Sequence, residues 1–254
     1  MLTFHLRIIH KLILREEQYL NDLDLVESAF IKPLRNAIPP IMPPPQVDDL
    51  IDDIFGNILD LRETNRHLLE VMYVRQREEG PIIQRVGDLF LGAATEFRYA
   101  YPTYIGHLPV SEKRLKEELE SNNGLRQFLE VRDCAESLSA TADIGTQQCS
   151  RQQSSQSGDS SRFDLKNFLN RPSEHLLQYP VLLEAVKNET AEENPDSEFL
   201  SEAIEAIRNL QSVAQLRTFQ AAMGKGVPGK WEWHELVPPE VRQKLSKQEA
   251  KRQS

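Results

Sequence analysis

The sequence predicts an all-α protein, and three observations lead to this prediction. Glycine occurs only 11 times in 254 residues. Long stretches are rich in Glu, Leu, Ala, Arg and Gln, whose side chains lose little rotamer freedom in a helix. Apolar residues recur at steps of three and four, the spacing that forms one stripe along a helix. A hydrophobic content of 39% is enough to build a substantial buried core.

The first two predicted helices are separated by prolines. The first runs from Leu6 to Leu34 and ends near Arg35. Its apolar stripe is formed by Ile9, Ile13, Leu20, Leu23 and Phe30. The stretch from Pro39 to Pro45 cannot continue this helix, because proline lacks an amide donor and its ring clashes with the preceding turn. We expect the second helix from Val47 to Arg77, before the break at Gly80–Pro81.

The middle of the chain predicts one long helix and two short ones. Ile82 to Tyr104 has an apolar and aromatic face suited to the centre of a bundle. We expect Pro102 and Pro109 to bracket its end. The shorter helices cover Ser111 to Ser121 and Asn123 to Glu136.

A polar segment divides these helices from the last two. Ser139 to Ser161 is rich in Ser and Gln and too polar to bury enough surface to offset chain ordering, so we expect a disordered insertion at 139–161. Helices are predicted again from Phe163 to Thr190 and from Ser197 to Met223. We therefore expect one helical domain over 1–222, followed by a Gly/Pro linker and a charged tail over 223–254.

Composition excludes several classes of function. A net charge of −9 and a pI near 5.3 argue against a nucleic-acid binder, which needs a basic surface to displace counterions from phosphates. Cys134 and Cys149 are the only thiols and lack the spacing of a zinc site or a disulfide framework, which favours a reducing compartment. No window approaches the ~20 apolar residues of a membrane span. The sequence also lacks a phosphate-binding loop, a metal-ligand cluster and a nucleophile motif, so we expect no cofactor, no metal and no active site with covalent chemistry.

Glu16 departs from the amphipathic pattern of the first helix. Its carboxylate falls on the same stripe as Ile13 and Leu20. From the residues alone, two interpretations stay open. An ion pair with an arginine at the edge of the core is favoured by about two to one over a role in binding a partner.

Two segments, Arg15 to Leu23 and Phe163 to Val186, resemble the first and third signature regions of Dbl-homology domains, the catalytic modules of Rho-family exchange factors. The first region is matched by Glu16, Tyr19, Leu20, Asp22 and Leu23, and then by Phe30, Pro33 and Leu34. The third is matched by Leu169, Pro172, Leu176, Tyr179, Pro180, Leu182 and Leu183. The likeness spans roughly residues 5 to 222 and is strongest to fungal exchange factors. It implies an elongated helical bundle that promotes GDP release from a Rho-family small GTPase in the cytoplasm, with recruitment to the cell cortex through other factors.

The resemblance also implies where the GTPase binds. Glu16 would contact the first switch of the GTPase, and the helix face around Gln178 would meet the second. The full set of implied contact residues is Glu16, Tyr19, Glu174, His175, Gln178 and Gln215. Several of these depart from the family pattern, because Gln178 stands in place of a basic residue, Glu174 and His175 in place of a Gln-Arg pair, and Gln215 in place of an asparagine. The departures imply reduced or altered exchange, or a module that binds a GTPase without accelerating release.

Overall fold

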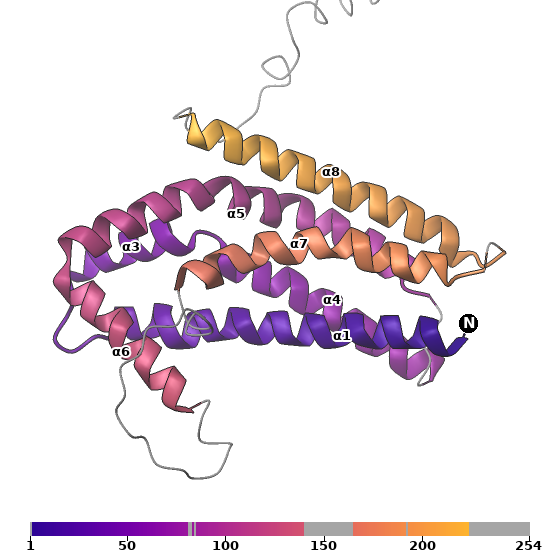
Figure 1. Ribbon diagram of the computed structural model, residues 1–254, viewed down its shortest axis with the longest axis horizontal. Coiled ribbons are helices and arrows are strands. Elements are labelled where there is room, and N and C mark those ends of the chain that lie inside the picture. The colour runs from indigo at the N-terminus through magenta and orange to yellow at the C-terminus, as the bar shows by residue number, and fades with distance from the viewer. Residues whose placement is uncertain (1, 81–82, 84, 140–164, 192, 224–254) are drawn as a thin grey trace, which may run out of the picture.

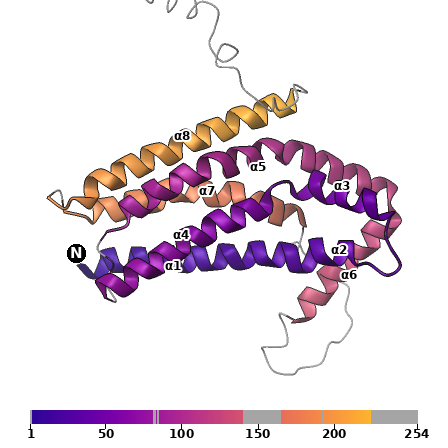
Figure 2. The ribbon, with the colours of Figure 1, turned by 180° about the vertical axis from the view of Figure 1, so that it is seen from behind.

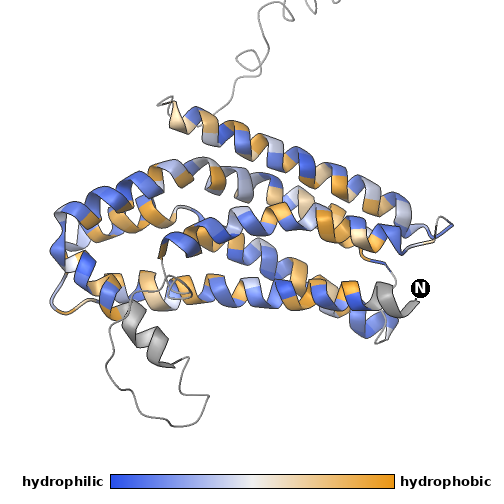
Figure 3. Cartoon of the chain, in the orientation of Figure 1, coloured by the Kyte–Doolittle hydropathy of each residue, from blue (hydrophilic) through white to orange (hydrophobic). Residues whose placement is uncertain are grey.

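A computed structural model describes residues 2–80, 83, 85–139, 165–191 and 193–223. Within those residues the regular structure is entirely helical, so the predicted fold class is confirmed. The helices form an elongated bundle (Figure 1). Apolar and polar residues alternate along most of them, as their hydropathy shows (Figure 3). The largest fully buried side chains are Tyr101, Tyr179, Phe30, Phe55, Phe90, Phe97 and Phe168.

The long helices of the bundle lie in two layers. Helix α7 (Leu165–Asn188) lies between α1 (Leu2–Leu25) and α8 (Asp196–Ala222) in one layer (Figure 1). Helices α4 (Ile58–Glu79) and α5 (Gly87–Ser121) form the other layer and face the viewer when the molecule is seen from behind (Figure 2). The most extensive contact joins α5 to α8. One side of the α1–α7–α8 layer therefore faces the core, and the other faces outward.

The opening helix contains an irregular turn that the sequence pattern did not reveal. After α1 the chain continues as a π-helix, η1 (Val26–Ile31), and then as α2 (Lys32–Arg35), so the predicted end at Arg35 is confirmed. The amide of Lys32 donates to the carbonyl of Glu27, five residues back. This wider turn lies directly before Pro33, whose ring and missing amide disturb the regular α-helical bonding of the segment.

The prediction of one helix from Val47 to Arg77 is wrong, because two helices occupy this region. Helix α3 (Pro44–Phe55) begins inside the predicted proline connector, since proline is well suited to the first turn of a helix. It ends at Gly56, whose φ of +50° is a conformation that other residues rarely adopt. Helix α4 then ends at Glu79, before Gly80, as the sequence predicted.

Helix α5 is longer than predicted and begins later. It starts at Gly87 instead of Ile82 and runs through Pro102 and Pro109 to Ser121, so the prediction that these prolines bracket its end is wrong. Its start is fixed by Asp196 at the beginning of α8. The buried carboxylate of Asp196 accepts hydrogen bonds from the amides of Val86, at 3.0 Å, and Gly87, at 2.9 Å. An acceptor at this place satisfies amides that the first turn of a helix leaves free.

The last three helices agree with the sequence prediction to within a few residues. Helix α6 covers Asn123–Ser139 and lies at the end of the bundle near α2 and α3 (Figure 2). Helix α7 continues through Pro180. The predicted insertion at 139–161, apart from Ser139, and the predicted tail at 223–254, apart from Met223, lie outside the described residues.

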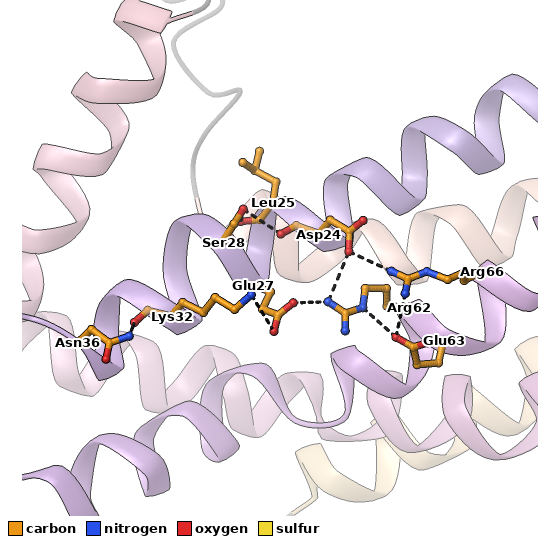
Figure 4. A network of polar contacts seen from close by, with 9 residues as sticks. All are labelled: Asp24, Leu25, Glu27, Ser28, Lys32, Asn36, Arg62, Glu63 and Arg66. Carbon is orange, nitrogen blue, oxygen red and sulfur yellow. Dashed lines mark hydrogen bonds and ion pairs between the residues drawn. The ribbon is translucent and has the colours of Figure 1, made fainter.

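A polar network joins α1 and η1 to α4 on the surface (Figure 4). Arg62 is its centre, with Nη1 3.4 Å from Asp24 Oδ1 and Nε 3.1 Å from Glu63 Oε1. Arg62 also pairs with Glu27, and the hydrogen bond that it donates lowers the pKa of the Glu27 carboxyl group. Arg66 adds a second cation, 3.3 Å from Asp24 Oδ1. The network therefore ties the irregular turn to α4.

We expect Arg62→Met to lower the free energy of unfolding by about 1 to 2 kcal/mol near neutral pH, because the side chain is only 15% exposed and donates charge-assisted hydrogen bonds. The folded-state pKa of Glu27 lies below its unfolded value, so this stabilisation is fully present above about pH 4.3. It is lost as the pH falls through the folded-state pKa. Urea unfolding curves of both proteins across this range measure the difference. Arg66→Met, at a more exposed position, is the control with a smaller loss; equal losses would contradict the central role of Arg62.

Candidate functional site

The carboxyl group of Glu16 lies inside the bundle, where only 1% of the residue is exposed. Its Oε1 is 2.9 Å from Nε2 of His175, and its Oε2 accepts a 3.0 Å hydrogen bond from the hydroxyl of Tyr179. Both partners are on α7. Glu16 therefore joins α1 to α7 through buried polar contacts.

These contacts belong to a buried network that reaches four helices. The hydroxyl of Tyr179 is also 2.9 Å from Asn65 Oδ1 on α4, and Tyr101 on α5 donates to the same oxygen at 3.1 Å. Asn65 Nδ2 donates to the carbonyl of Leu61 at 2.7 Å. If Tyr179 and His175 both donate to Glu16, and Tyr101 donates to Asn65, each side chain has a partner. The arrangement meets the usual requirement that buried polar groups are hydrogen-bonded.

Aromatic rings surround this network. The ring of Tyr19 stacks on His175 with centroids 3.8 Å apart, and the two residues are 4% and 9% exposed. Burial raises the pKa of the Tyr19 and Tyr179 hydroxyls well above the usual range for tyrosine, so both stay neutral near pH 7. Tyr179 therefore keeps the proton with which it acts as a donor.

The structure places Glu16, Tyr19 and His175, which the resemblance implies as contacts of a GTPase, inside the fold, and their contact with a GTPase stays a prediction. The other interpretation of Glu16, internal pairing, is the one observed, although its partner is His175 and not an arginine.

The remaining predicted residues of α7 face outward beside α1. Gln178 is exposed, and its Oε1 accepts a 2.7 Å hydrogen bond from Nη1 of Arg15. Glu174 is exposed one turn earlier. Leu177, between them, is a large apolar residue with 50% of its surface exposed. Farther along the same pair of helices, Arg171 pairs with Asp22.

Gln215 is also exposed, on α8. It stands on a different helix from Glu174 and Gln178, but α7 and α8 are joined near it, because Gln211 Nε2 donates to the carbonyl of Leu176 at 2.8 Å. We name the exposed side chains of these three helices the outer face, which comprises Arg15, Glu174, Leu177, Gln178 and Gln215. The structure thus divides the predicted residues between a buried network and this outer face.

Sequence reasoning missed Asn65 and Arg15. A signal for Asn65 was present, since a polar residue occurs between Leu61 and Leu68 on the apolar stripe of α4. Arg15 gave no comparable signal, because an arginine beside a stripe is ordinary on a helix surface.

Neither a metal site nor a membrane-crossing helix is found in the described part of the chain. No group of three or more His, Cys, Asp or Glu side chains there could hold a metal ion. None of the helices described combines the length and apolar character that a membrane crossing requires.

Comparison with known proteins identifies the family. The profile of the RhoGEF domain matches residues 8–215. Over 201 residues the chain is 24% identical to Rho1 guanine nucleotide exchange factor 3 of Schizosaccharomyces pombe, which covers 79% of the chain and 14% of that protein. It is 26% identical over 211 residues to Rho guanine nucleotide exchange factor 38 of Mus musculus, covering 83% of the chain and 24% of that protein. The chain thus spans a quarter or less of the length of these two relatives.

Solved structures show the same fold. In the crystal structure of the PDZ-RhoGEF DH/PH domains with GTP-gamma-S activated RhoA, the similar chain has a TM-score of 0.68 and 18% identity, covering 87% of this chain and 55% of that one. A structure of the Vav1 exchange factor has a TM-score of 0.64 and 19% identity, covering 87% and 51%. The helical bundle, its elongated shape and the match over residues 8–215 agree, and the chain belongs to the RhoGEF domain family.

Proposed function

We propose that this chain promotes GDP release from a Rho-family small GTPase by stabilising the nucleotide-free state. The observation that carries the proposal is the RhoGEF match over residues 8–215, which includes every residue of the outer face. Such a factor needs no covalent step and no cofactor of its own. It works by differential binding, because a protein that prefers the nucleotide-free GTPase must weaken nucleotide binding by the same factor.

The outer face has the composition of a surface that binds another protein. Leu177 offers exposed apolar area, and Glu174, Gln178 and Arg15 provide polar groups around it. An apolar centre with a polar rim is typical of specific protein interfaces. The hydrogen bond between Arg15 and Gln178 orders two long side chains before a partner binds, which reduces the entropy lost on association.

The same proposal assigns the GTPase-binding domain to residues 1–222 and the remaining 223–254 to a linker and tail. It places the activity in the cytoplasm, with recruitment to the cell cortex through other factors. An exchange factor must reach its GTPase, and we expect these other factors to bring the outer face of the chain to a Rho-family GTPase.

A second candidate function is binding of a GTPase without acceleration of release. It is favoured by the position of Glu16, because the carboxylate that the resemblance directs to the first switch is buried and bonded to α7. A release assay separates the two functions. Wild-type chain is mixed with a panel of Rho-family GTPases that carry fluorescent GDP, and accelerated release supports exchange. Stable complexes without acceleration support the second function.

We expect Leu177→Asp to lower the rate of release about tenfold, because a charge would be desolvated in the centre of the interface. The residue is half exposed, so the substitution leaves the thermal midpoint of the chain nearly unchanged. Val131→Asp on α6 is the matched control: Val131 is 65% exposed but lies outside the outer face, and we expect full activity. If Leu177→Asp accelerated GDP release as fast as Val131→Asp, the α7 surface would be excluded from the interface.

A further inference from the structure

Helices α5 and α7 contain four prolines in their interiors. Proline has no amide hydrogen, so the carbonyl four residues earlier in the helix loses its bond. For Pro180 on α7 this carbonyl belongs to Leu176, and for Pro109 on α5 it belongs to Ile105. The other two prolines are Pro102 and Pro172.

Helix α8 provides side-chain donors for two of these carbonyls. Gln211 Nε2 donates to Leu176 O at 2.8 Å, and Thr218 Oγ1 lies 3.1 Å from Ile105 O. The two residues are seven positions apart, which is close to two turns, so they lie on one side of α8. The Thr218 hydroxyl has a second acceptor within its own helix, Ala214 O at 3.0 Å, whereas the bond from Gln211 connects α8 to α7.

The bond from Gln211 lies between the two parts of the outer face. Leu176 directly precedes Leu177 and lies two residues before Gln178 on α7. Gln211 is one turn before Gln215 on α8. Helix packing by apolar side chains tolerates small sliding movements, whereas a hydrogen bond of 2.8 Å to one particular carbonyl fixes the register of the two helices.

We propose that Gln211 is a positioning residue for nucleotide exchange, which holds the α7 and α8 parts of the outer face in one register. This proposal rests on the proposed function. Gln211 is half-buried and directed at the Leu176 carbonyl, so it acts through Gln178 and Gln215 and does not itself need to touch the GTPase. Proline at position 180 is what makes the Leu176 carbonyl available to it.

The first test compares two variants that each lose one donor from α8. Gln211→Met keeps the length of the side chain and removes the donor, and we expect release of fluorescent GDP from a responsive Rho-family GTPase to fall roughly fivefold in kcat/KM. Thr218→Val removes the donor to α5. We expect its thermal midpoint to fall about as much as that of Gln211→Met, while its rate of GDP release stays within about twofold of wild type. An unchanged rate for Gln211→Met, or an equal fall in rate for both variants, would overturn the proposal.

The second test uses Pro180→Ala, which restores the amide that can bond Leu176 O within α7. In this background Gln211→Met is expected to lower the thermal midpoint less than it does in the wild type, because the carbonyl keeps a partner. The same loss in both backgrounds would show that the Gln211 bond does not depend on Pro180. If wild-type chain accelerates release from no GTPase, the proposed function fails together with the role of Gln211 in it. The thermal comparison still reports whether the bond between α7 and α8 exists.

Discussion

Replacing Glu16 with alanine is expected to lower the free energy of unfolding by about 3 to 5 kcal/mol. The substitution removes the acceptor of two buried hydrogen bonds, from His175 Nε2 and from the Tyr179 hydroxyl. With Glu16 only 1% exposed, water does not reach the site to replace the lost acceptor. His175 and Tyr179 would each lose a buried acceptor beside a new cavity, which makes this one of the most damaging single substitutions in the bundle.

Urea unfolding of the full chain, followed by far-UV circular dichroism, measures this loss. Glu16→Gln is expected to lose less, because its amide oxygen still accepts one hydrogen bond and its shape fills the site. Glu70→Ala is the control at an exposed position of α4, with a change within about 0.5 kcal/mol. An unchanged midpoint for Glu16→Ala would show that the carboxyl group is not held inside, and would return Glu16 to the binding surface.

The buried position of Glu16 also changes how exchange assays should be interpreted. A fall in GDP release by Glu16→Ala is expected from the loss of folded protein alone, because Glu16 connects α1 to α7, the two helices that carry Arg15 and Gln178. Release rates of this variant therefore need to be corrected for the folded fraction. Leu177→Asp is the more direct test of the interface, since that side chain is half exposed.

The sequence predicted the fold well where helices are regular and amphipathic, as in α7 and α8. It failed where tertiary contacts override a local rule. Pro109 was expected to help end α5, but the helix continues, and a donor from α8 serves the Ile105 carbonyl that this proline leaves free. At Gly56 the error is the reverse, because the apolar pattern predicted one continuous helix. A single residue with positive φ divides that segment into two helices.

The candidate site was predicted only in part, and Glu16 shows why. A carboxylate on an apolar stripe was recognisable from spacing, and so was the choice between internal pairing and partner binding. The choice itself depends on His175 and Tyr179, about 160 residues away, which α7 brings next to α1 only in the folded bundle. Periodicity within one helix carries no information about such a partner. The outward positions of Glu174, Gln178 and Gln215 agree with the resemblance, and their role in binding stays a prediction.

Gly87→Ala is expected to destabilise the bundle by about 3 kcal/mol or more, because there is no room for a methyl group at this position. A Cβ atom there would lie 2.5 Å from the backbone nitrogen of Leu200 and 2.8 Å from the carbonyl carbon of Phe199. Both are backbone atoms of α8, so relief requires movement of the helix and not of a flexible side chain. That movement is opposed by Asp196, whose carboxylate holds the amides of Val86 and Gly87.

Gly92→Ala, five residues later on the same helix, is expected to have the opposite sign. No neighbouring atom lies within 4 Å of its Cβ position, and alanine is favoured over glycine in a helix by about 0.5 to 1 kcal/mol. Thermal unfolding of the two variants beside the wild type therefore separates backbone propensity from the close approach of α5 and α8. If Gly87→Ala also raised the thermal midpoint, the start of α8 would not lie against Gly87. The hydrogen bonds from Val86 and Gly87 to Asp196, which fix the start of α5, would then be contradicted as well.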